Sequence, residues 1–295
     1  MSEGPGADDA RYVHPRAGLT GRLLGALANS AAIARARRAV MSRLPFPVLE
    51  SDVRDVVYMT WMVDAARAAA HVPRLPHGMS LWTADGRTPF TILTYRHGHF
   101  GPSLLGPARV LCPSPLQSNW RLYLRTAPSA APPVRTVLFV RNVMDSLVYA
   151  LGTRLFSDAL PTHLAAGFEF DGSPARGCLH IQGGAGSAPN LQASWSATAG
   201  RALPPAFAAA FADWPAAIDY LTLQDAAIAP VPHLGRVAYA GISLPADVGA
   251  ITPLSLDDAR FACPFVASLA PAGPALCFHL PRVRFRALSE RILPA

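Results

Sequence analysis

Short segments with the composition of β-strands recur along most of this 295-residue chain. Residues 134–141 are nearly continuous valine, leucine and phenylalanine, which is typical of a strand buried on both faces. Residues 120–125 alternate apolar and polar side chains, as a half-buried strand does. The remaining predicted strands cover residues 88–95, 177–181, 191–197, 237–244 and 276–287. A chain with so many strands is constrained to a large sheet or a barrel.

Helical patterns are short and fall mainly between these strands. We predict helices over residues 53–72, 145–156, 205–211, 214–222 and 256–260. The 29 prolines lie mostly at junctions between segments, where they do not interrupt a sheet. The sequence therefore predicts an α+β fold that is mostly β, with an antiparallel or barrel-like sheet and helices at its periphery.

The balance of apolar and charged residues predicts a folded chain. Hydrophobic residues make up 51% and charged residues only 15%, against about 25% charged in an average globular domain. No run reaches the roughly 18 apolar residues that a membrane-spanning helix needs. We therefore expect a cytoplasmic protein with a sizeable core.

All 26 basic residues are arginine, so the chain has no lysine. This excludes catalysis through a lysine Schiff base and the lysines of P-loop and kinase sites. Residues 11–49 hold seven arginines and no acid, which accounts for the net charge of +7. A nucleic-acid-binding domain usually carries its excess of positive charge on the folded body, so we expect no nucleic-acid partner.

The first part of the chain is predicted to be an appendage to a single domain that covers residues 53–290. Residues 1–17 have the composition of a disordered start, and residues 18–44 that of a basic amphipathic helix. One stripe of this helix carries Leu19, Leu23, Leu27, Ala31 and Ala34. We expect the stripe to pack on the body. The alternative is a weak contact of residues 18–43 with an anionic membrane surface.

The cysteines and the glycine-rich segment point to no cofactor or metal site. Cys112, Cys178, Cys263 and Cys277 lack the close spacing of zinc ligands, so we expect small buried thiols in a reducing compartment. Residues 182–187 are rich in glycine, but they lack the spacing and the following helix of a dinucleotide site. We interpret them as a hairpin turn.

Histidine and serine motifs are equally unspecific. His97 and His99 could place two imidazoles together, but the nearest further histidines, His71 and His77, are not at a diagnostic metal spacing. The serines at 187, 194 and 196 lack the Gly-x-Ser-x-Gly elbow of a serine hydrolase. We predict no bound metal and no cofactor.

The segment 117–124 carries more information. If it is a strand, Asn119, Arg121 and Tyr123 share one face, while Trp120, Leu122 and Leu124 share the other. The tryptophan and leucines indicate a core face. The polar face is either solvated or the lining of a polar cavity in which a guanidinium holds a carboxylate.

The same segment, together with 81–88, 137–141, 152–156 and 160–165, resembles the YqjF-like family of uncharacterised bacterial proteins related to acetoacetate decarboxylase. Residues 214–224 and 278–288 fit this resemblance, which covers roughly residues 53–290. It implies an acetoacetate-decarboxylase-like fold: an antiparallel, cone- or barrel-like sheet with peripheral helices and a central cavity.

The resemblance also implies which residues face that cavity. Thr162 and His163 stand where the decarboxylase carries its paired lysines, and Gln117 stands where the family usually has a glutamate. We therefore predict an intracellular enzyme that acts on a small, oxygenated, anionic metabolite by acid/base chemistry without a Schiff base, as an isomerase, cyclase or lyase. His163 and Arg121 are the predicted catalytic residues. The predicted substrate-binding residues are Gln117, Asn119, Tyr123, Arg154 and Thr162.

The alternative is a non-catalytic binding protein that kept the cavity and lost the decarboxylase chemistry. Its partner would again be a small molecule, and a homo-oligomer is compatible with either hypothesis. The two differ in whether His163 and the arginines converge on one pocket.

Overall fold

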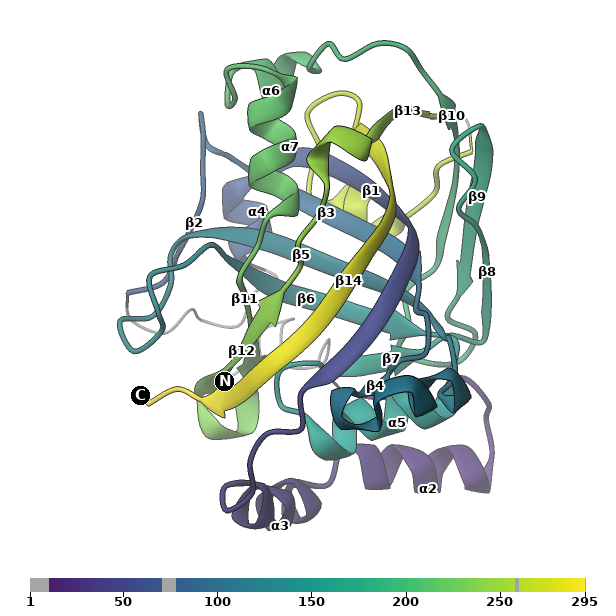
Figure 1. The fold of residues 1–295 in the computed structure, drawn as a ribbon, viewed down its shortest axis with the longest axis vertical. Helices are drawn as coiled ribbons and strands as arrows, with labels where there is room; N and C mark the ends of the chain where they lie inside the picture. The colour runs from purple at the N-terminus through teal and green to yellow at the C-terminus, as the bar shows by residue number, and fades with distance from the viewer. Residues whose placement is uncertain (1–10, 71–77, 258–259, 295) are drawn as a thin grey trace.

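The computed structural model describes residues 11–70, 78–257 and 260–294 (Figure 1). Part of its sheet closes into a ring. Neighbouring strands pair antiparallel around this ring, except that β6 and β11 run parallel. In ring order, the strands are β1 (Leu49–Asp64), β3 (Arg87–Arg96), β5 (Leu116–Thr126), β6 (Thr136–Met144), β11 (Ala226–Val231), β12 (Arg236–Ser243) and β14 (Leu276–Ile292), which pairs back with β1.

Further strands leave the ring and cover part of its outside. From β14 the sheet continues through β13 (Thr252–Leu256), β10 (Leu191–Ala197), β9 (Arg176–Gln182) and β8 (Gly167–Asp171). The short strands β2 (Ser80–Leu81), β4 (Gly101–Pro102) and β7 (Thr162–Leu164) pair with β5, β1 and β6. The sheet is therefore mixed and only partly closed, not the antiparallel barrel that the sequence predicted. The helical connection from β6 to β7 explains one parallel pair.

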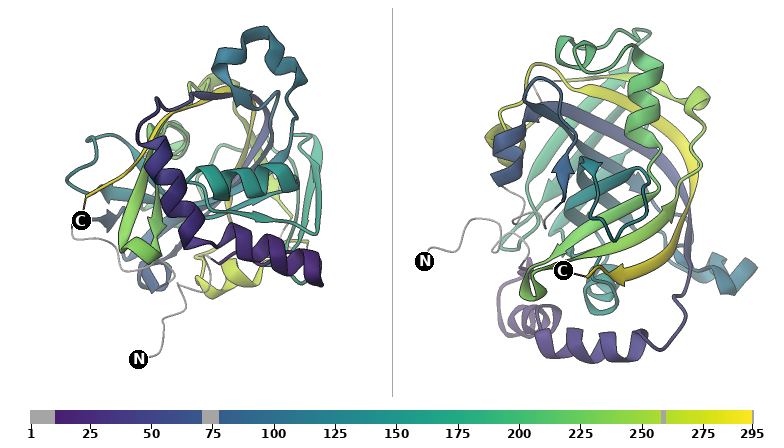
Figure 2. Two further views of the ribbon diagram at one scale, coloured as in Figure 1. Left: turned by 90° about the horizontal axis from the view of Figure 1, so that it is seen from below. Right: turned by 90° about the vertical axis from the view of Figure 1, so that its left-hand side faces the viewer.

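Helices lie at both ends of the ring (Figures 1 and 2). At one end, α7 (Trp214–Thr222) inserts Trp214, Ile218 and Leu221 into a core cluster shared with Tyr58 of β1. Asp213 caps α7 by accepting a hydrogen bond from the Ala216 amide. At the other end, α5 (Leu147–Phe156) lies across the ring opening (Figure 2).

The remaining helical segments are short. They are α4 (Ala65–Ala70), α6 (Pro205–Ala208), α8 (Pro264–Ser268), η1 (Ser103–Leu111), η2 (Pro232–Leu234) and η3 (Val248–Ala250). No helix in the described parts of the chain is long and apolar enough to cross a membrane.

The N-terminal region differs from its prediction. Instead of one helix over 18–44 there are two, α2 (Leu19–Ala28) and α3 (Ala31–Met41), because Ser30 starts a new helix by accepting from the Ile33 amide. Tyr12, within the predicted disordered start, is buried and exchanges backbone hydrogen bonds with the Asn29 side chain. Residues 1–10 of that start lie outside the described residues.

Two predicted helices are strands over part of their length, while residues 65–70 of the first do form the short helix α4. Residues 53–64 belong to β1, whose run from Val56 to Val63 is buried on both faces. Periodicity does not separate such a run from a buried helix, and its valines and aromatic residues favour the strand. Residues 252–256 form β13, and residues 258–259 of the predicted helix 256–260 lie outside the described residues. The glycine-rich segment 182–187 does join two antiparallel strands, β9 and β10, as predicted.

Candidate functional site

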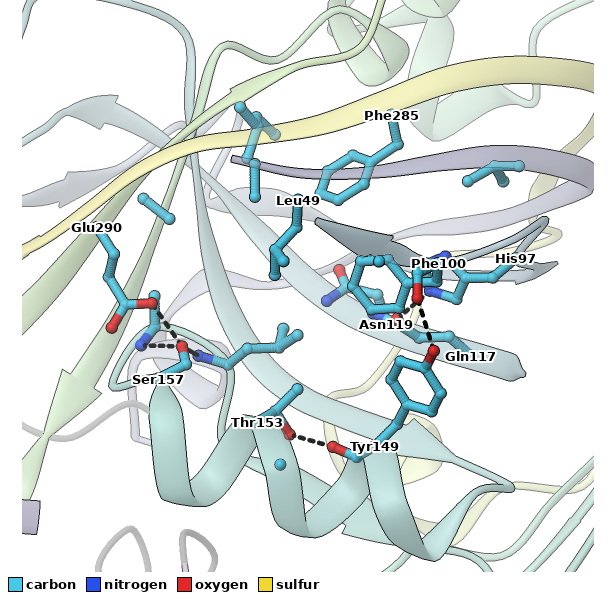
Figure 3. Close-up of a pocket in the computed structure, with 18 of the residues that line it drawn as sticks. Leu49, His97, Phe100, Gln117, Asn119, Tyr149, Thr153, Ser157, Phe285 and Glu290 are labelled. Atoms are coloured by element: carbon cyan, nitrogen blue, oxygen red, sulfur yellow. Dashed lines mark hydrogen bonds between the residues drawn. The ribbon is translucent and has the colours of Figure 1, made fainter. Parts of the chain in front are cut away.

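A cavity of about 550 Å³ lies inside the ring. Strands β1, β3, β5, β12 and β14 contribute its walls, α5 forms its floor, and residues 41–49 border it. Figure 3 shows α5 below the cavity, with Leu49 and Phe285 on the opposite side. Most of the wall is apolar and includes Val53, Leu93, Phe139, Ile242 and Val283. A cavity of this size and character suits a small organic ligand.

The polar face of β5 lines this cavity. Gln117, Asn119 and Arg121 face into it, whereas Trp120 and Leu122 lie in the core on the other side of the sheet. This settles the choice that the spacing left open: the polar face belongs to a cavity and is not solvated. Tyr123 does not line the cavity but packs in the core under α7.

Arg121 is a buried cation without an acidic partner. Its Nε donates to the Tyr123 hydroxyl at 3.3 Å and its Nη2 to the Leu221 carbonyl, at the end of α7, at 2.8 Å. The guanidinium carbon lies 5.4 Å from the centres of the Tyr58 and Tyr123 rings. No carboxylate among the described residues pairs with it. A guanidinium has five donors, so several remain for a ligand.

Asn119 adds an unused acceptor beside this cation. Its side chain is buried, and its Oδ1 has no hydrogen-bond partner in the described structure. Its Nδ2 reaches Asn142 Oδ1 only at 3.5 Å. A buried amide oxygen without a donor costs free energy, so the site favours a ligand that supplies one.

The Gln117 amide is hydrogen-bonded through both its nitrogen and its oxygen. Its Nε2 donates to Asn142 Oδ1 at 2.7 Å, and its Oε1 accepts from His97 Nε2 at 2.7 Å. His97 Nδ1 in turn lies 2.8 Å from the Ser51 hydroxyl. Burial lowers the pKa of His97 to about 4, so the ring is neutral and positions Gln117. Gln117 is therefore held in place in the cavity wall, and one of the two N–H donors of its amide has no hydrogen-bond partner in the described structure.

Thr162 continues this network from behind the wall. Asn142 Nδ2 donates to the Thr162 hydroxyl at 2.7 Å, and the Thr153 hydroxyl, from α5, donates to the same oxygen at 2.7 Å. Thr153 lines the cavity but Thr162 does not.

A second polar group of the cavity was not predicted. Glu290 lies at the side of the cavity away from Gln117 and Asn119 (Figure 3). Its carboxylate accepts from the Ser157 hydroxyl and the Asp158 amide, both at 2.6 Å. Burial raises the pKa of Glu290. In the sequence, Glu290 is one acid in a strand-like segment rich in charge, so no signal marked it.

His163 does not face the cavity, contrary to the expectation carried over from the decarboxylase. In the pairing of β7 with β6, Thr162 lies opposite Asn142 and His163 opposite Val143. Successive side chains of a strand point to opposite faces, so Thr162 joins the cavity-side network while His163 lies on the far side with Val143.

The hydrogen bonds of His163 connect neighbouring segments of the chain. His163 Nε2 lies 3.4 Å from the Arg154 guanidinium, which can only donate, so this nitrogen is the acceptor. His163 Nδ1 therefore carries the proton and donates to the Ser187 hydroxyl at 2.7 Å. Ser187 also accepts from the Val13 amide at 2.9 Å. Burial, followed by the charges of Arg154 and Arg141, lowers the pKa of His163. The histidine thus ties the glycine-rich turn and the N-terminal segment to β7.

Arg154 also lies away from the cavity. Its guanidinium carbon is 5.2 Å from the centre of the Tyr12 ring, and burial lowers its pKa to about 10. Of the predicted site residues, the structure therefore brings Gln117, Asn119 and Arg121 together in the cavity. It places Tyr123 and Thr162 next to them and the pair His163 and Arg154 elsewhere.

No group of three metal-ligating side chains occurs among the described residues. His97 is committed to Ser51 and Gln117, and His71 and His77 lie outside the described residues. All four cysteines are free thiols; Cys263 and Cys277 are buried as predicted, whereas Cys178 is exposed.

Comparison with known proteins gives the fold. No protein-family model and no curated protein matches the sequence. Among solved structures, the enduracididine biosynthesis enzyme MppR matches with a TM-score of 0.51 and 16% identity, over 85% of this chain and 88% of MppR. An acetoacetate decarboxylase-like enzyme from Sphingomonas wittichii RW1 matches with a TM-score of 0.51 and 11% identity, over 85% of this chain and 95% of that enzyme. The chain thus shares the fold of acetoacetate decarboxylase-like enzymes, while the narrower resemblance to the YqjF-like family finds no match.

Proposed function

We propose that this protein binds a small organic acid in its central cavity, with the carboxylate held by Arg121, an oxygen substituent held by Asn119 and an apolar body along the walls. The observation that carries the proposal is the buried guanidinium of Arg121, which faces the cavity and has no acidic partner among the described residues. Burying an unpaired cation costs several kcal/mol, and an anionic ligand offsets that cost.

The chemistry of the two side chains defines the ligand class. Arg121 favours a planar carboxylate, which can accept two parallel hydrogen bonds. Asn119 Oδ1 needs a donor, as the hydroxyl of a hydroxy acid or of an enol would provide. MppR, which shares the fold, has been solved with pyruvate, a small keto acid. We therefore expect keto and hydroxy acids with an alkyl or aryl body.

The test compares ligands and variants by isothermal titration calorimetry. The acids are titrated beside their uncharged amides, and the amides are expected to bind at least tenfold more weakly, as for loss of a charged hydrogen bond. Arg121→Met should produce a similar loss. The matched control is Arg125→Met, an exposed arginine on the same strand, which should bind as wild type. Equal affinity for acid and amide in the wild-type protein would overturn the proposal even if Arg121→Met does not fold.

Glu290 supports a second candidate function, acid/base catalysis on the bound acid. It is a carboxyl group that lines the cavity and has a raised pKa, as a general acid or base requires. No lysine is present, so a side-chain imine is not part of this chemistry. His163, the catalytic residue predicted from the sequence, does not line the cavity.

Exchange of the α-hydrogen of the bound acid for deuterium, followed by NMR in D₂O, tests this second function. Glu290→Gln should slow the exchange by about 10²–10⁴, and His163→Gln should not. Loss of exchange in His163→Gln alone, with binding intact, would return the catalytic role to His163. Absence of exchange in the wild-type protein leaves binding as the function.

A further inference from the structure

The leucine stripe of α2 points into solvent instead of packing on the body. Leu19 and Leu23 are 66% and 61% exposed. The opposite side of α2, at Gly21, packs against the N-terminal segment, since an added Cβ would meet the Arg16 carbonyl oxygen at 2.1 Å. The sequence predicted the opposite, a buried stripe. An apolar helix face that the fold leaves uncovered indicates an interaction surface.

Other apolar side chains are exposed at the same end of the molecule. In η1, Leu104 and Leu111 are 79% and 86% exposed, and in α5, Val148 and Phe156 are 76% and 66% exposed. Figure 1 places α2, α3 and α5 next to one another at this end of the ring, and Figure 2 shows η1, which follows β4, projecting to one side of them. We call Leu19, Leu23, Leu104, Leu111, Val148 and Phe156 the apolar rim.

Part of the apolar rim borders the cavity. Val148 and Phe156 both line the cavity and reach solvent. Met41, at the end of α3, and Pro102, next to η1, also line it. A ligand that enters the cavity at this point therefore passes Val148 and Phe156.

The charge at this end is positive. Arg22, Arg35 and Arg43 are exposed and make no ion pair with any described residue. Arg37 and Arg38 do pair, and both hold the same acid, Asp158. No acid among the described residues therefore neutralises the exposed cations of α2 and α3.

We propose that the apolar rim, with the arginines of α2 and α3, docks the molecule on an anionic lipid surface with the cavity mouth toward the membrane. Exposed leucines and unpaired arginines on short helices match the interface between acyl chains and anionic headgroups. A second copy of this chain fits less well, because a symmetric interface would bring like-charged arginines together. Nucleic acid would satisfy the arginines but would not bury the leucines. Docking does not depend on the proposed ligand.

Vesicle flotation of the full chain, without added ligand, tests the docking. The vesicles are phosphatidylcholine alone and phosphatidylcholine with roughly 30% phosphatidylglycerol, at ionic strengths of about 0.05 M and about 0.5 M. We expect binding to the anionic vesicles at low salt only. Leu19→Ser with Leu23→Ser should weaken it at least tenfold. Arg22→Gln with Arg35→Gln should weaken it by about fivefold for each arginine.

Matched controls carry the same changes at the opposite end of the ring. Val248 in η3 and Arg201 before α6 are exposed there, so Val248→Ser and Arg201→Gln should float as wild type. The proposal is overturned if wild type floats equally with both vesicle types or with neither. It is also overturned if the leucine variant floats like wild type. Sedimentation that reveals a dimer dependent on Leu19 and Leu23 would assign the rim to a second copy instead. A failed ligand titration would leave all these results unchanged.

Discussion

The two ends of the ring depart from ordinary globular packing in opposite ways. At the end closed by α7, polar groups are buried: Arg121 and Asn119 lie among apolar walls with unused hydrogen-bonding capacity. At the end around α2, α5 and η1, large apolar side chains are exposed. Buried polar groups and exposed apolar patches are the informative exceptions to normal burial. The comparison teaches that the interior of the closed end is built for a polar ligand group and the open end for an apolar surface.

The largest expected effect is a difference in stability between two variants, one of which loses an arginine at the closed end and the other an arginine at the open end. Arg121→Ala removes the guanidinium that donates to the Leu221 carbonyl and the Tyr123 hydroxyl, and it leaves the Tyr123 hydroxyl as the donor to that carbonyl. The loss of these buried hydrogen bonds and of the packing of the guanidinium beside two tyrosine rings should lower the free energy of unfolding by about 2–4 kcal/mol. Arg22→Ala removes an exposed cation and should cause no measurable change. Urea unfolding of both variants measures the difference. Equal stabilities would mean that Arg121 is not structurally coupled to α7.

The second effect is a pH dependence at the end of the ring where α5 lies, because the His97 ring stacks on Phe100, which in turn stacks on Tyr149 of α5. His97 has a pKa of about 4 when folded and about 6.5 when unfolded, so in this window the unfolded state binds more protons. Stability is therefore complete above pH 6.5 and is lost as the pH falls toward 4, by about 3 kcal/mol.

His97→Gln should flatten this loss, whatever its stability at neutral pH. Urea unfolding at several pH values measures the slope, with His180→Gln on β9 as the matched control. An unchanged slope in His97→Gln would contradict a neutral, buried imidazole at this position. His163, whose pKa is also lowered, contributes in the same direction.

The third effect concerns the attachment of the open end. Asp158 holds Arg37 and Arg38 in a largely buried ion pair, so Asp158→Asn leaves two cations without their partner. Amide hydrogen exchange in α3 should become about 10–100 times faster while the ring strands stay protected. Asp219→Asn is the control, because its pair with Arg135 is exposed and contributes little. If the whole ring loses protection with Asp158→Asn, the N-terminal helices are part of the core rather than an attached layer.

The closed end was more predictable from the sequence than the open end. The alternation on β5 correctly separated Asn119 and Arg121 from Trp120, because a strand has a fixed period of two. His163 was expected in the cavity from the resemblance to the decarboxylase, and that resemblance does not fix the register of β7, where a shift of one residue exchanges the two faces. The leucine stripe of α2 was recognised, but periodicity does not tell which partner covers it.

The smallest expected effect is the pH dependence of stability that arises from Glu290. Burial raises its pKa above that of an unfolded glutamate, so between the two values the folded state holds a proton that the unfolded state has lost. Stability is therefore greatest below the unfolded pKa and declines as the pH rises through the folded one. Glu290→Gln cannot ionise and should remove this decline. Glu169→Gln, on an exposed position of β8, is the control and should retain it. Unfolding curves for wild type and Glu290→Gln that stay parallel over this pH range would show that Glu290 titrates as in the unfolded chain, and the case for a proton-transfer role would lose its physical basis.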